Sequence, residues 1–325
     1  MDSQLIESNY ELKVSDIKLL DEHFGTEIYV IGTEAKKYIV KVLPLYFENM
    51  ENEGLVSGYL YSRGHKVARL IKSREGSYVI KTPKFQFTVQ EYVEGKTLPT
   101  NSAPKWLLEK SADFLGKTTL ALKDWDPLPL RFDRSFFTAD TALRKKQQYI
   151  GELERAKELG DKKIIPVWEE QIRHLERISR FQIDADRLTY ANSHGDFHIG
   201  QIIVQDHDIT VIDWSSVCRL PVCLDVMTSY VFASPNCREG AVDVEGLGGY
   251  IQAYVKHFPL TEYDIQAMPY VLYFWHCVCN YSPNELCSIA GKYRSMALLI
   301  QKMLNWLYVH VDDLSKDLQG RVNSR

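Results

Sequence analysis

The segment Ser193–Val217, SHGDFHIGQIIVQDHDITVIDWSSV, joins two apolar runs to several acidic and amide side chains. The apolar runs flank a short polar turn at 205–208. Short β-branched runs on either side of such a turn predict a β-hairpin. The hairpin would hold Asp196, Gln201 and Asp213 near one another at its open end.

These three side chains are of the types that phosphoryl transfer needs. One carboxylate can accept the proton of an attacking hydroxyl, and a second carboxylate with an amide oxygen can hold a divalent cation. Taken singly, Asp196 could form a turn after glycine and Asp213 could end a strand. Their order and strand context together favour a catalytic site. His194 is expected to pack behind the loop and not to carry protons.

His194–Gln201 (HGDFHIGQ) and Val211–Trp214 (VIDW) resemble the two signature motifs of the aminoglycoside phosphotransferase and choline-kinase-like family. Its members are small-molecule kinases, and it has spore-coat kinase-like relatives. The resemblance implies that Asp196 is the catalytic carboxylate and Asp213 a metal ligand, with ATP (or GTP) and Mg²⁺ as cofactors. The family usually has asparagine at the position of Gln201. Gln201 keeps the amide oxygen but is one methylene longer, which could shift, weaken or abolish the metal site.

The fold implied by this resemblance is α+β and protein-kinase-like, with a small β-rich lobe and a larger, mainly helical lobe. We expect an N-terminal nucleotide-binding lobe at 1–93 and a hinge at 94–98. The helical C-terminal lobe, with the catalytic hairpin and the acceptor site, would span 99–325. The amino-terminal strands are predicted at 17–20, 28–31, 38–43, 67–71, 77–81 and 85–91.

Lys41 is the nucleotide-binding lysine that the resemblance implies. Strand alternation places Tyr38, Val40 and Val42 on one face and Lys41 on the other, pointing into the cleft between the lobes. A helix predicted at 47–63 carries the family's lysine-pairing glutamate, which we assign to Glu53, with Glu51 as the alternative. On a solvent-facing turn, Glu53 would have no such role.

Two backbone segments are further candidates for nucleotide binding. The resemblance places a phosphate-covering turn at 21–27, where Gly25 is the only glycine and an ordinary hairpin loop is an equal explanation. It also places a hinge at 85–95, where backbone groups from Glu91 to Val93 would contact a purine edge. Because backbone contacts tolerate most side chains, the residue types in this segment are weak evidence for nucleotide binding.

Composition excludes several classes of function. The chain has 325 residues with 45% hydrophobic and 25% charged, as ordinary globular proteins have, and a net charge of −4. That charge provides no basic field for nucleic acid. The longest apolar window, 269–279, is shorter than the roughly 20 residues needed to cross a bilayer, and the amino terminus does not read as a signal peptide. We therefore expect no nucleic-acid partner, no membrane insertion and a cytoplasmic location.

The remaining chain reads as mainly helical. Asp225 resembles the family residue that ties down the catalytic loop, although it could simply cap a helix beginning near Val226. Acidic residues between 239 and 264 would suit a cationic acceptor, although surface helices are often acidic. The aromatic residues at 270–275 could box such a ligand or belong to the core. Helices are predicted at 104–122, 136–159, 166–181, 242–257, 262–281 and 285–311.

The sequence therefore favours an ATP-dependent kinase for a hydroxyl of a small molecule, such as an amino sugar, an aminoglycoside-like antibiotic or a choline-like metabolite. Two alternatives remain open. Gln201 and the glycine-poor turn are compatible with a degenerate kinase fold that binds without turnover. A kinase with a protein acceptor would carry the same motifs.

Overall fold

A computed structural model describes residues 1–23, 25–48, 50–288 and 291–323 of the chain. The contacts divide the chain into two compact units. The first unit consists of Met1–Leu98 and Gly200–Val217, and the second of Pro99–Ile199 and Cys218–Arg325. The division after residue 98 coincides with the end of the predicted hinge. The hairpin segment groups by its contacts with the first unit, and the expected lobe boundaries stay a prediction.

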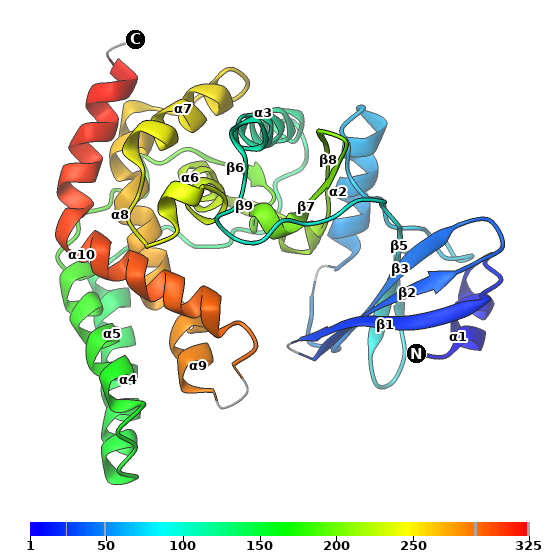
Figure 1. Cartoon of the computed structure of the whole chain (residues 1–325), viewed down its shortest axis with the longest axis horizontal. Coiled ribbons are helices and arrows are strands. Elements are labelled where there is room, and N and C mark those ends of the chain that lie inside the picture. The colour runs from blue at the N-terminus through cyan, green and yellow to red at the C-terminus, as the bar shows by residue number, and fades with distance from the viewer. Residues whose placement is uncertain (24, 49, 289–290, 324–325) are drawn as a thin grey trace. The chain divides into compact units, whose positions relative to one another are not determined.

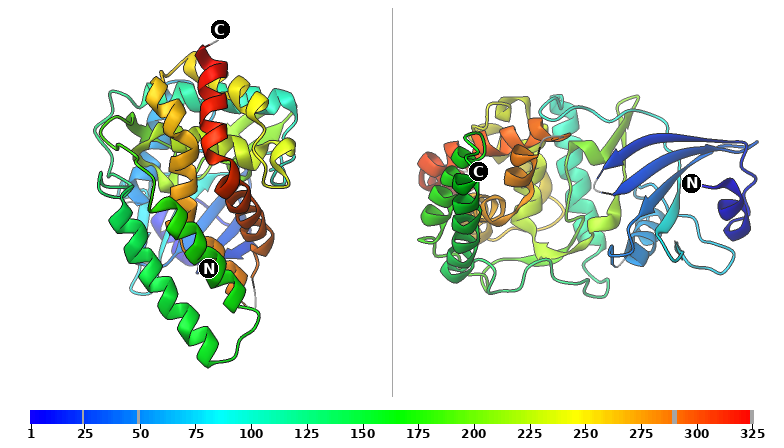
Figure 2. Two further views of the ribbon diagram at one scale, coloured as in Figure 1. Left: turned by 90° about the vertical axis from the view of Figure 1, so that its left-hand side faces the viewer. Right: turned by 90° about the horizontal axis from the view of Figure 1, so that it is seen from below.

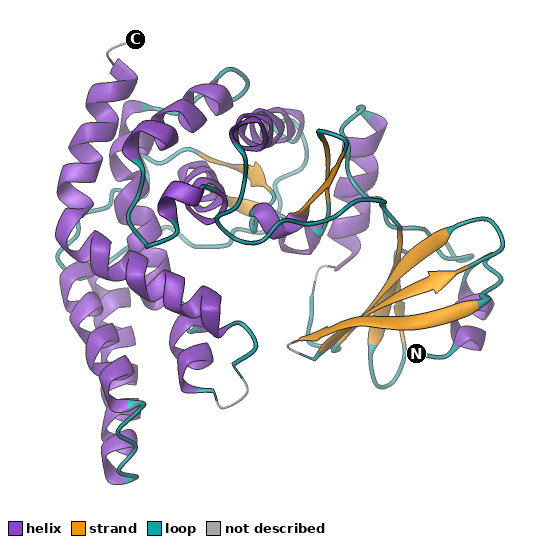
Figure 3. Cartoon of the chain, in the orientation of Figure 1, coloured by secondary structure: helices purple, strands orange, loops and turns teal. Residues whose placement is uncertain are grey.

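The first unit is built on a five-stranded antiparallel sheet with the strand order β1-β2-β3-β5-β4. Figure 1 labels β1, β2, β3 and β5 of this sheet. Figure 3 shows these strands in orange, and the second unit is mainly helical. The α+β expectation is thus confirmed. The strands are β1 Asp16–His23, β2 Thr26–Gly32, β3 Lys37–Leu43, β4 Val79–Lys81 and β5 Gln86–Glu91.

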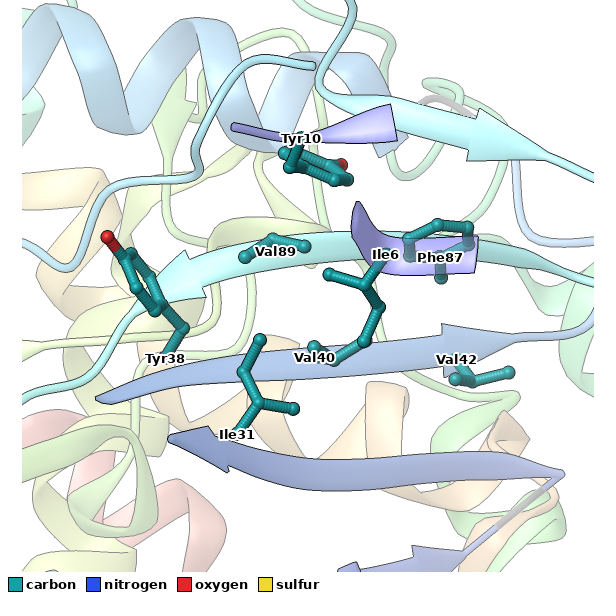
Figure 4. Close-up of a cluster of buried hydrophobic side chains, with 8 residues drawn as sticks. All are labelled: Ile6, Tyr10, Ile31, Tyr38, Val40, Val42, Phe87 and Val89. Atoms are coloured by element: carbon teal, nitrogen blue, oxygen red, sulfur yellow. The ribbon is translucent and has the colours of Figure 1, made fainter. Parts of the chain in front are cut away.

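One face of this sheet forms a hydrophobic cluster (Figure 4). Tyr38, Val40 and Val42 of β3 lie in this cluster, as their alternation predicts. Ile6 and Tyr10 cover them; Ile6 belongs to α1 (Ser3–Asn9), a helix that the sequence analysis did not predict. Because this face of β3 is filled by the core, the alternate residue Lys41 must leave the sheet on the opposite face.

The predicted hairpin is present within the first unit. Strands β7 (Ile202–Gln205) and β8 (Asp208–Val211) pair antiparallel around Asp206 and His207. Both turn residues have positive φ, 47° and 64°, as a type I′ turn requires. Asp and His tolerate this conformation better than most residues, so a turn without glycine can form here.

Segment 66–71 attaches the hairpin to the rest of the first unit. The Val211 amide donates to the Lys66 carbonyl at 3.0 Å, and the Ala68 amide donates to the Val211 carbonyl at 3.1 Å. We had predicted a strand at 67–71, but the structure has only isolated bridges from Val67 and Leu70. This segment therefore links the hairpin and β5 without continuing as a strand of the sheet.

The turn between β1 and β2 is tighter than predicted. We expected a loop over residues 21–27, but the strand pairing continues to His23 and Thr26. Phe24 lies outside the described residues. Gly25 has φ = 75°, a left-handed conformation that favours glycine.

The second unit contains most of the helices (Figure 3). The prediction of one helix over 285–311 is wrong, because two separate helices, α9 and α10, occupy this region and the second continues to Asn323. All other predicted helices are present, with ends shifted by a few residues. The observed helices are α3 Lys105–Ala121, α4 Ala139–Glu158, α5 Ile165–Ile178, α6 Val222–Ala233, α7 Val244–Val255, α8 Glu262–Val278, α9 Tyr281–Cys287 and α10 Arg294–Asn323.

Two local features organise this second unit. Helices α4 and α5 lie side by side as an antiparallel pair, which Figure 2 shows in green. Strands β6 (Tyr190–Ser193) and β9 (Cys218–Pro221) form a short antiparallel ladder on either side of the hairpin in the sequence. This ladder was not predicted, yet it fixes the two ends of the motif-bearing segment.

Within the part of the chain that the structure describes, no helix combines the length and the apolar character that crossing a bilayer would need.

Candidate active site

Three predicted site residues of the first unit form one charged cluster. The Lys41 ammonium donates to Glu53 Oε1 at 3.1 Å and to Asp213 Oδ1 at 2.8 Å. Lys41 and Asp213 are 172 positions apart in the chain. The structure therefore brings together the lysine, its pairing glutamate and the second motif carboxylate, as the sequence reasoning required.

Burial makes the charges of this cluster interdependent. The side chains of Lys41 and Glu53 are 9% and 2% exposed, whereas Asp213 retains 33% exposure. Burial alone would lower the pKa of Lys41, but the carboxylates of Asp213 and Glu53 outweigh it and the pKa rises. Burial raises the pKa of Glu53, against the attraction of Lys41. Lys41 therefore stays protonated and holds two carboxylates, of which the more exposed one can accept further ligands.

Glu53 reaches Lys41 because α2 (Met50–Ser62) packs closely against its surroundings in this unit. A Cβ at Gly54 would lie 2.2 Å from the Tyr78 ring, so only glycine permits this approach. The alternative, Glu51, is engaged elsewhere, because it accepts hydrogen bonds from Ser77 and from the amides of Tyr78 and Val79. Glu53 is therefore the partner of Lys41.

Asp213 and Gln201 lie at the same end of the hairpin. The Ile212 amide donates to the Gln201 carbonyl at 2.9 Å, which extends the β7–β8 ladder by one step. Asp213 follows directly and adopts the left-handed conformation, with φ = 60° and ψ = 62°. Such conformations in residues other than glycine concentrate at functional sites. The segment Trp214–Ser216 then packs against α2, which places Asp213 beside Lys41.

Three residues, Glu91, Val93 and Gly25, come from the two backbone segments that were expected to bind nucleotide. Glu91 is held by Arg69, whose guanidinium donates to the carboxylate at 2.6 and 3.1 Å and whose carbonyl accepts from the Glu91 amide. Val93 follows the end of β5, outside regular structure. Gly25 lies exposed in the β1–β2 turn. A nucleotide-binding role for any of the three stays a prediction.

Asp196 belongs to the second unit, in the loop that follows β6. Its carboxylate is 48% exposed, and His198 Nε2 lies 3.8 Å from Oδ2. His194 is buried and packs edge-on against Phe197, which stacks on Phe114 of α3. The architectural interpretation of His194 is thus confirmed. The expected proximity of Asp196 to Gln201 and Asp213 stays a prediction.

Asp225 ties down this loop from within the second unit. Its Oδ2 accepts a hydrogen bond from Ser193 Oγ at 2.7 Å and from the Gly195 amide at 2.9 Å. Helix α6 begins at Val222, so Asp225 lies in its first turn and the expectation that it caps a helix near Val226 is wrong. Asp225 instead holds the loop that carries Asp196, as the family resemblance implies, through the two hydrogen bonds that it accepts.

Asp225→Ala is expected to lower the melting temperature and the rate of phosphoryl transfer together. Hydrogen bonds to a charged group contribute about 1.5–3 kcal/mol, and the substitution leaves two donors behind in a buried position. Asp225→Asn retains an acceptor oxygen and should lose less of both quantities. Thermal unfolding and initial rates measure the two effects. An alanine variant as stable as the wild type would contradict this role.

The residues predicted to form an acidic, aromatic acceptor wall are mostly engaged elsewhere. Asp243 and Asp264 serve as a helix cap and in a capping box, and Glu239 pairs with Lys302. Among the aromatic residues, Tyr273 and Phe274 lie in the core. The core interpretation of this cluster is therefore correct for both.

Two residues near Asp196 were missed by the sequence analysis. His198 lies within the first motif, so its proximity could have been anticipated from the motif itself. Arg131 lies in a proline-containing segment without any motif, and its guanidinium donates to the Gly195 carbonyl. No local signal in the sequence marks Arg131, because its role depends on a partner 64 positions away.

The sequence profile of the phosphotransferase enzyme family matches residues 16–258, about three quarters of the chain, and includes every predicted site residue. The chain belongs to this family. Its membership confirms the resemblance to aminoglycoside phosphotransferases and the expectation of a phosphotransferase enzyme. Among curated proteins, none matches the chain.

Several solved structures share the fold across nearly the whole chain. An aminoglycoside phosphotransferase from Alicyclobacillus acidocaldarius is 15% identical with a TM-score of 0.68, covering 100% of this chain and 97% of its own. Choline kinase from Cryptosporidium parvum is 11% identical with a TM-score of 0.64 and coverages of 99% and 100%. An amicoumacin kinase solved with AMP-PNP and Ca²⁺ is 16% identical with a TM-score of 0.63 and coverages of 96% and 94%. These likenesses confirm the kinase-like fold.

Proposed function

We propose that this phosphotransferase uses ATP to phosphorylate a hydroxyl group of a small molecule. The observation that carries the proposal is the buried cluster of Lys41, Glu53 and Asp213. Burying an ammonium group between two carboxylates costs desolvation free energy. Such a group is useful in a kinase because it can position a phosphate. Support for the nucleotide and for a small acceptor comes from structural neighbours, among them the amicoumacin kinase with AMP-PNP and an aminopropanol kinase.

In this proposal, each side chain has a separate task. Lys41 uses two N–H groups for Glu53 and Asp213, and an ammonium has a third for a phosphate oxygen. Glu53 keeps Lys41 oriented. Asp196 accepts or orients the proton of the acceptor hydroxyl, for which its exposed carboxylate is suited. Catalysis of this kind is positioning and charge stabilisation without a covalent intermediate.

A divalent cation fits the donor set at the end of the hairpin. Asp213 and Gln201 offer carboxylate and amide oxygens, and Mg²⁺ is commonly held by one or two carboxylates together with substrate phosphates. The Asp213 carboxylate, whose side chain is 33% exposed, provides a negative charge that also favours a cation. Bound there, Mg²⁺ would neutralise charge on the phosphates.

The deciding experiment is an acceptor screen coupled to ADP formation. Wild type and Asp196→Asn are assayed with ATP and with GTP against aminoglycosides, amino sugars, amino alcohols and choline. Turnover with one class of acceptor by the wild type, and its loss in the variant, supports the proposal. Equal ADP formation by both proteins on every compound would contradict the role of Asp196.

Gln201 and the tight glycine-poor turn leave a second candidate, a kinase fold that binds nucleotide without turnover. Mg²⁺-dependent ATP binding by calorimetry, with no product for any small acceptor, would favour it. Labelled ATP in a whole lysate tests a protein acceptor, because only that activity would label polypeptides.

Two substitutions of Gln201 are expected to differ in their effect on the Mg²⁺ requirement. Gln201→Ala removes the amide oxygen, and the Mg²⁺ concentration for half-maximal rate should rise by roughly tenfold or more. Gln201→Asn retains the oxygen in the form that the family uses and should keep activity. Titration of the initial rate with Mg²⁺ measures both. An alanine variant with the wild-type Mg²⁺ dependence would show that Gln201 is not a ligand.

A further inference from the structure

Arg131 directs a guanidinium at the peptide bond that precedes Asp196. Its Nη1 donates to the Gly195 carbonyl, and this carbonyl shares its peptide plane with the amide of Asp196. The opposite side of Gly195 is also fixed, because its amide donates to Asp225 at 2.9 Å. Gly195 has φ = 81°, a conformation that favours glycine and restrains the loop little by itself. Two charged side chains thus set the orientation of a flexible residue.

The segment that carries Arg131 is attached to the same short ladder as the catalytic loop. The Arg131 amide donates to the Arg219 carbonyl, and the Arg219 amide donates to the Pro129 carbonyl, both at 2.9 Å. Asn192, in β6, binds the preceding segment, accepting from the Leu128 amide at 3.1 Å. Backbone hydrogen bonds therefore hold the Cα of Arg131 beside the loop independently of its side chain.

The guanidinium is engaged with neutral groups. Its carbon lies 5.1 Å from the centre of the Trp275 ring, a cation–π distance, and among the described residues no carboxylate pairs with it. Burial raises the pKa of the neighbouring Cys218 thiol to about 12 although the charge of Arg131 opposes this rise, so the thiol stays neutral and gives Arg131 no ionic partner. A partly buried charge without an ionic partner is costly unless its contact with the loop has a use.

We propose that Arg131 is a positioning residue that fixes the Gly195–Asp196 peptide plane and thereby aims the Asp196 carboxylate. A hydrogen bond from a charged donor to a carbonyl is stronger than a neutral one, so it can select one orientation of this plane. A displacement near 1 Å of a catalytic group can cost about 100-fold in rate. The kinetic part of this proposal rests on the phosphotransferase function proposed above.

The test compares Arg131→Met with Arg134→Met, a matched change in the same segment. Arg134 pairs with Asp186 and lies 5.5 Å from the Tyr190 ring centre, and it makes no contact with Gly195. Arg131→Met should lower kcat by roughly 10- to 100-fold with the Kd for ATP unchanged. Arg131→Lys, which keeps a charged donor, should recover part of kcat. Arg134→Met should stay within about twofold of the wild type.

Hydrogen exchange tests the proposed role of Arg131 without requiring turnover. If Arg131 restrains the loop, the Gly195 amide should exchange about tenfold faster or more in Arg131→Met and at the wild-type rate in Arg134→Met. An unchanged exchange rate, or a kcat loss equal in both variants, overturns the proposal. If the wild type phosphorylates no acceptor, the proposed function is contradicted, but the exchange rates still test whether Arg131 restrains the loop. If Arg131→Met does not fold, Arg131→Gln replaces it with the same expected directions.

Discussion

Asp196→Asn is expected to lower kcat by roughly 10²- to 10⁴-fold, the contribution typical of a general base. Asparagine has nearly the same shape but cannot accept the hydroxyl proton as a carboxylate does. Because the Asp196 side chain is 48% exposed, its replacement should leave the melting temperature unchanged. Initial rates of ADP formation with a saturating acceptor, beside thermal unfolding, measure the two quantities.

The matched control is Asp206→Asn, the same chemical change in the hairpin turn. Asp206 is exposed and has φ = 47°, a conformation that asparagine also tolerates, so both stability and rate should stay at wild-type values. If Asp196→Asn retains the wild-type kcat, Asp196 is not the base. If it loses melting temperature in proportion to activity, Asp196 is a structural residue.

Lys41→Met is expected to lower both activity and stability, because it removes the cation from a buried pair. Leaving Glu53 without its partner should cost about 3–5 kcal/mol, as uncompensated buried charges do. Loss of a phosphate-binding donor should reduce kcat/KM for ATP by roughly 10²- to 10³-fold. Thermal unfolding and ATP titrations of the rate measure the two effects.

The double variant Lys41→Met/Glu53→Leu separates these two effects. Replacing both buried charges by apolar side chains should restore most of the lost stability, because the remaining carboxylate, Asp213, is 33% exposed and can be solvated. Activity should stay at the level of Lys41→Met, since the phosphate donor is still absent. A double variant that regains activity would show that Lys41 acts only through stability, and a single variant as stable as the wild type would contradict the buried pair.

Both pairs of experiments depend on how the charges are held in the two units. Lys41 and Glu53 are buried together, so their effects on stability and on activity are coupled and need a double variant. Asp196 is 48% exposed, so its replacement is expected to change activity with little change in stability. Asp225 and Arg131 hold the backbone of its loop. Replacing Asp225 by alanine is expected to lower stability and rate together, whereas replacing Arg131 by methionine is expected to lower kcat.

Most of the local structure could be predicted from the sequence. The alternation of Tyr38, Val40 and Val42 predicted the core face of β3 and the opposite direction of Lys41. The hairpin followed from two β-branched runs around a polar turn. These predictions succeed because strand periodicity and turn chemistry act over a few residues.

Predictions failed where long-range contacts decide the structure. The ladder of β6 and β9 joins four-residue strands that are too short to give a periodic signal. The break between α9 and α10 interrupts an apolar pattern that we read as one helix over 285–311. The turn around Gly25 is tighter than expected, because pairing between β1 and β2 continues into polar residues.

Two motifs and short-range periodicity were sufficient to predict the family, the α+β class and the charged residues that form the Lys41 cluster. The three-dimensional packing was needed to establish that Glu53 and not Glu51 pairs with Lys41, and that Asp213 joins them from 172 positions away. It also decided that Arg131 holds the Gly195 carbonyl. Such contacts depend on how distant segments pack, and hydrophobic burial and backbone pairing set that packing without leaving a local pattern around either partner.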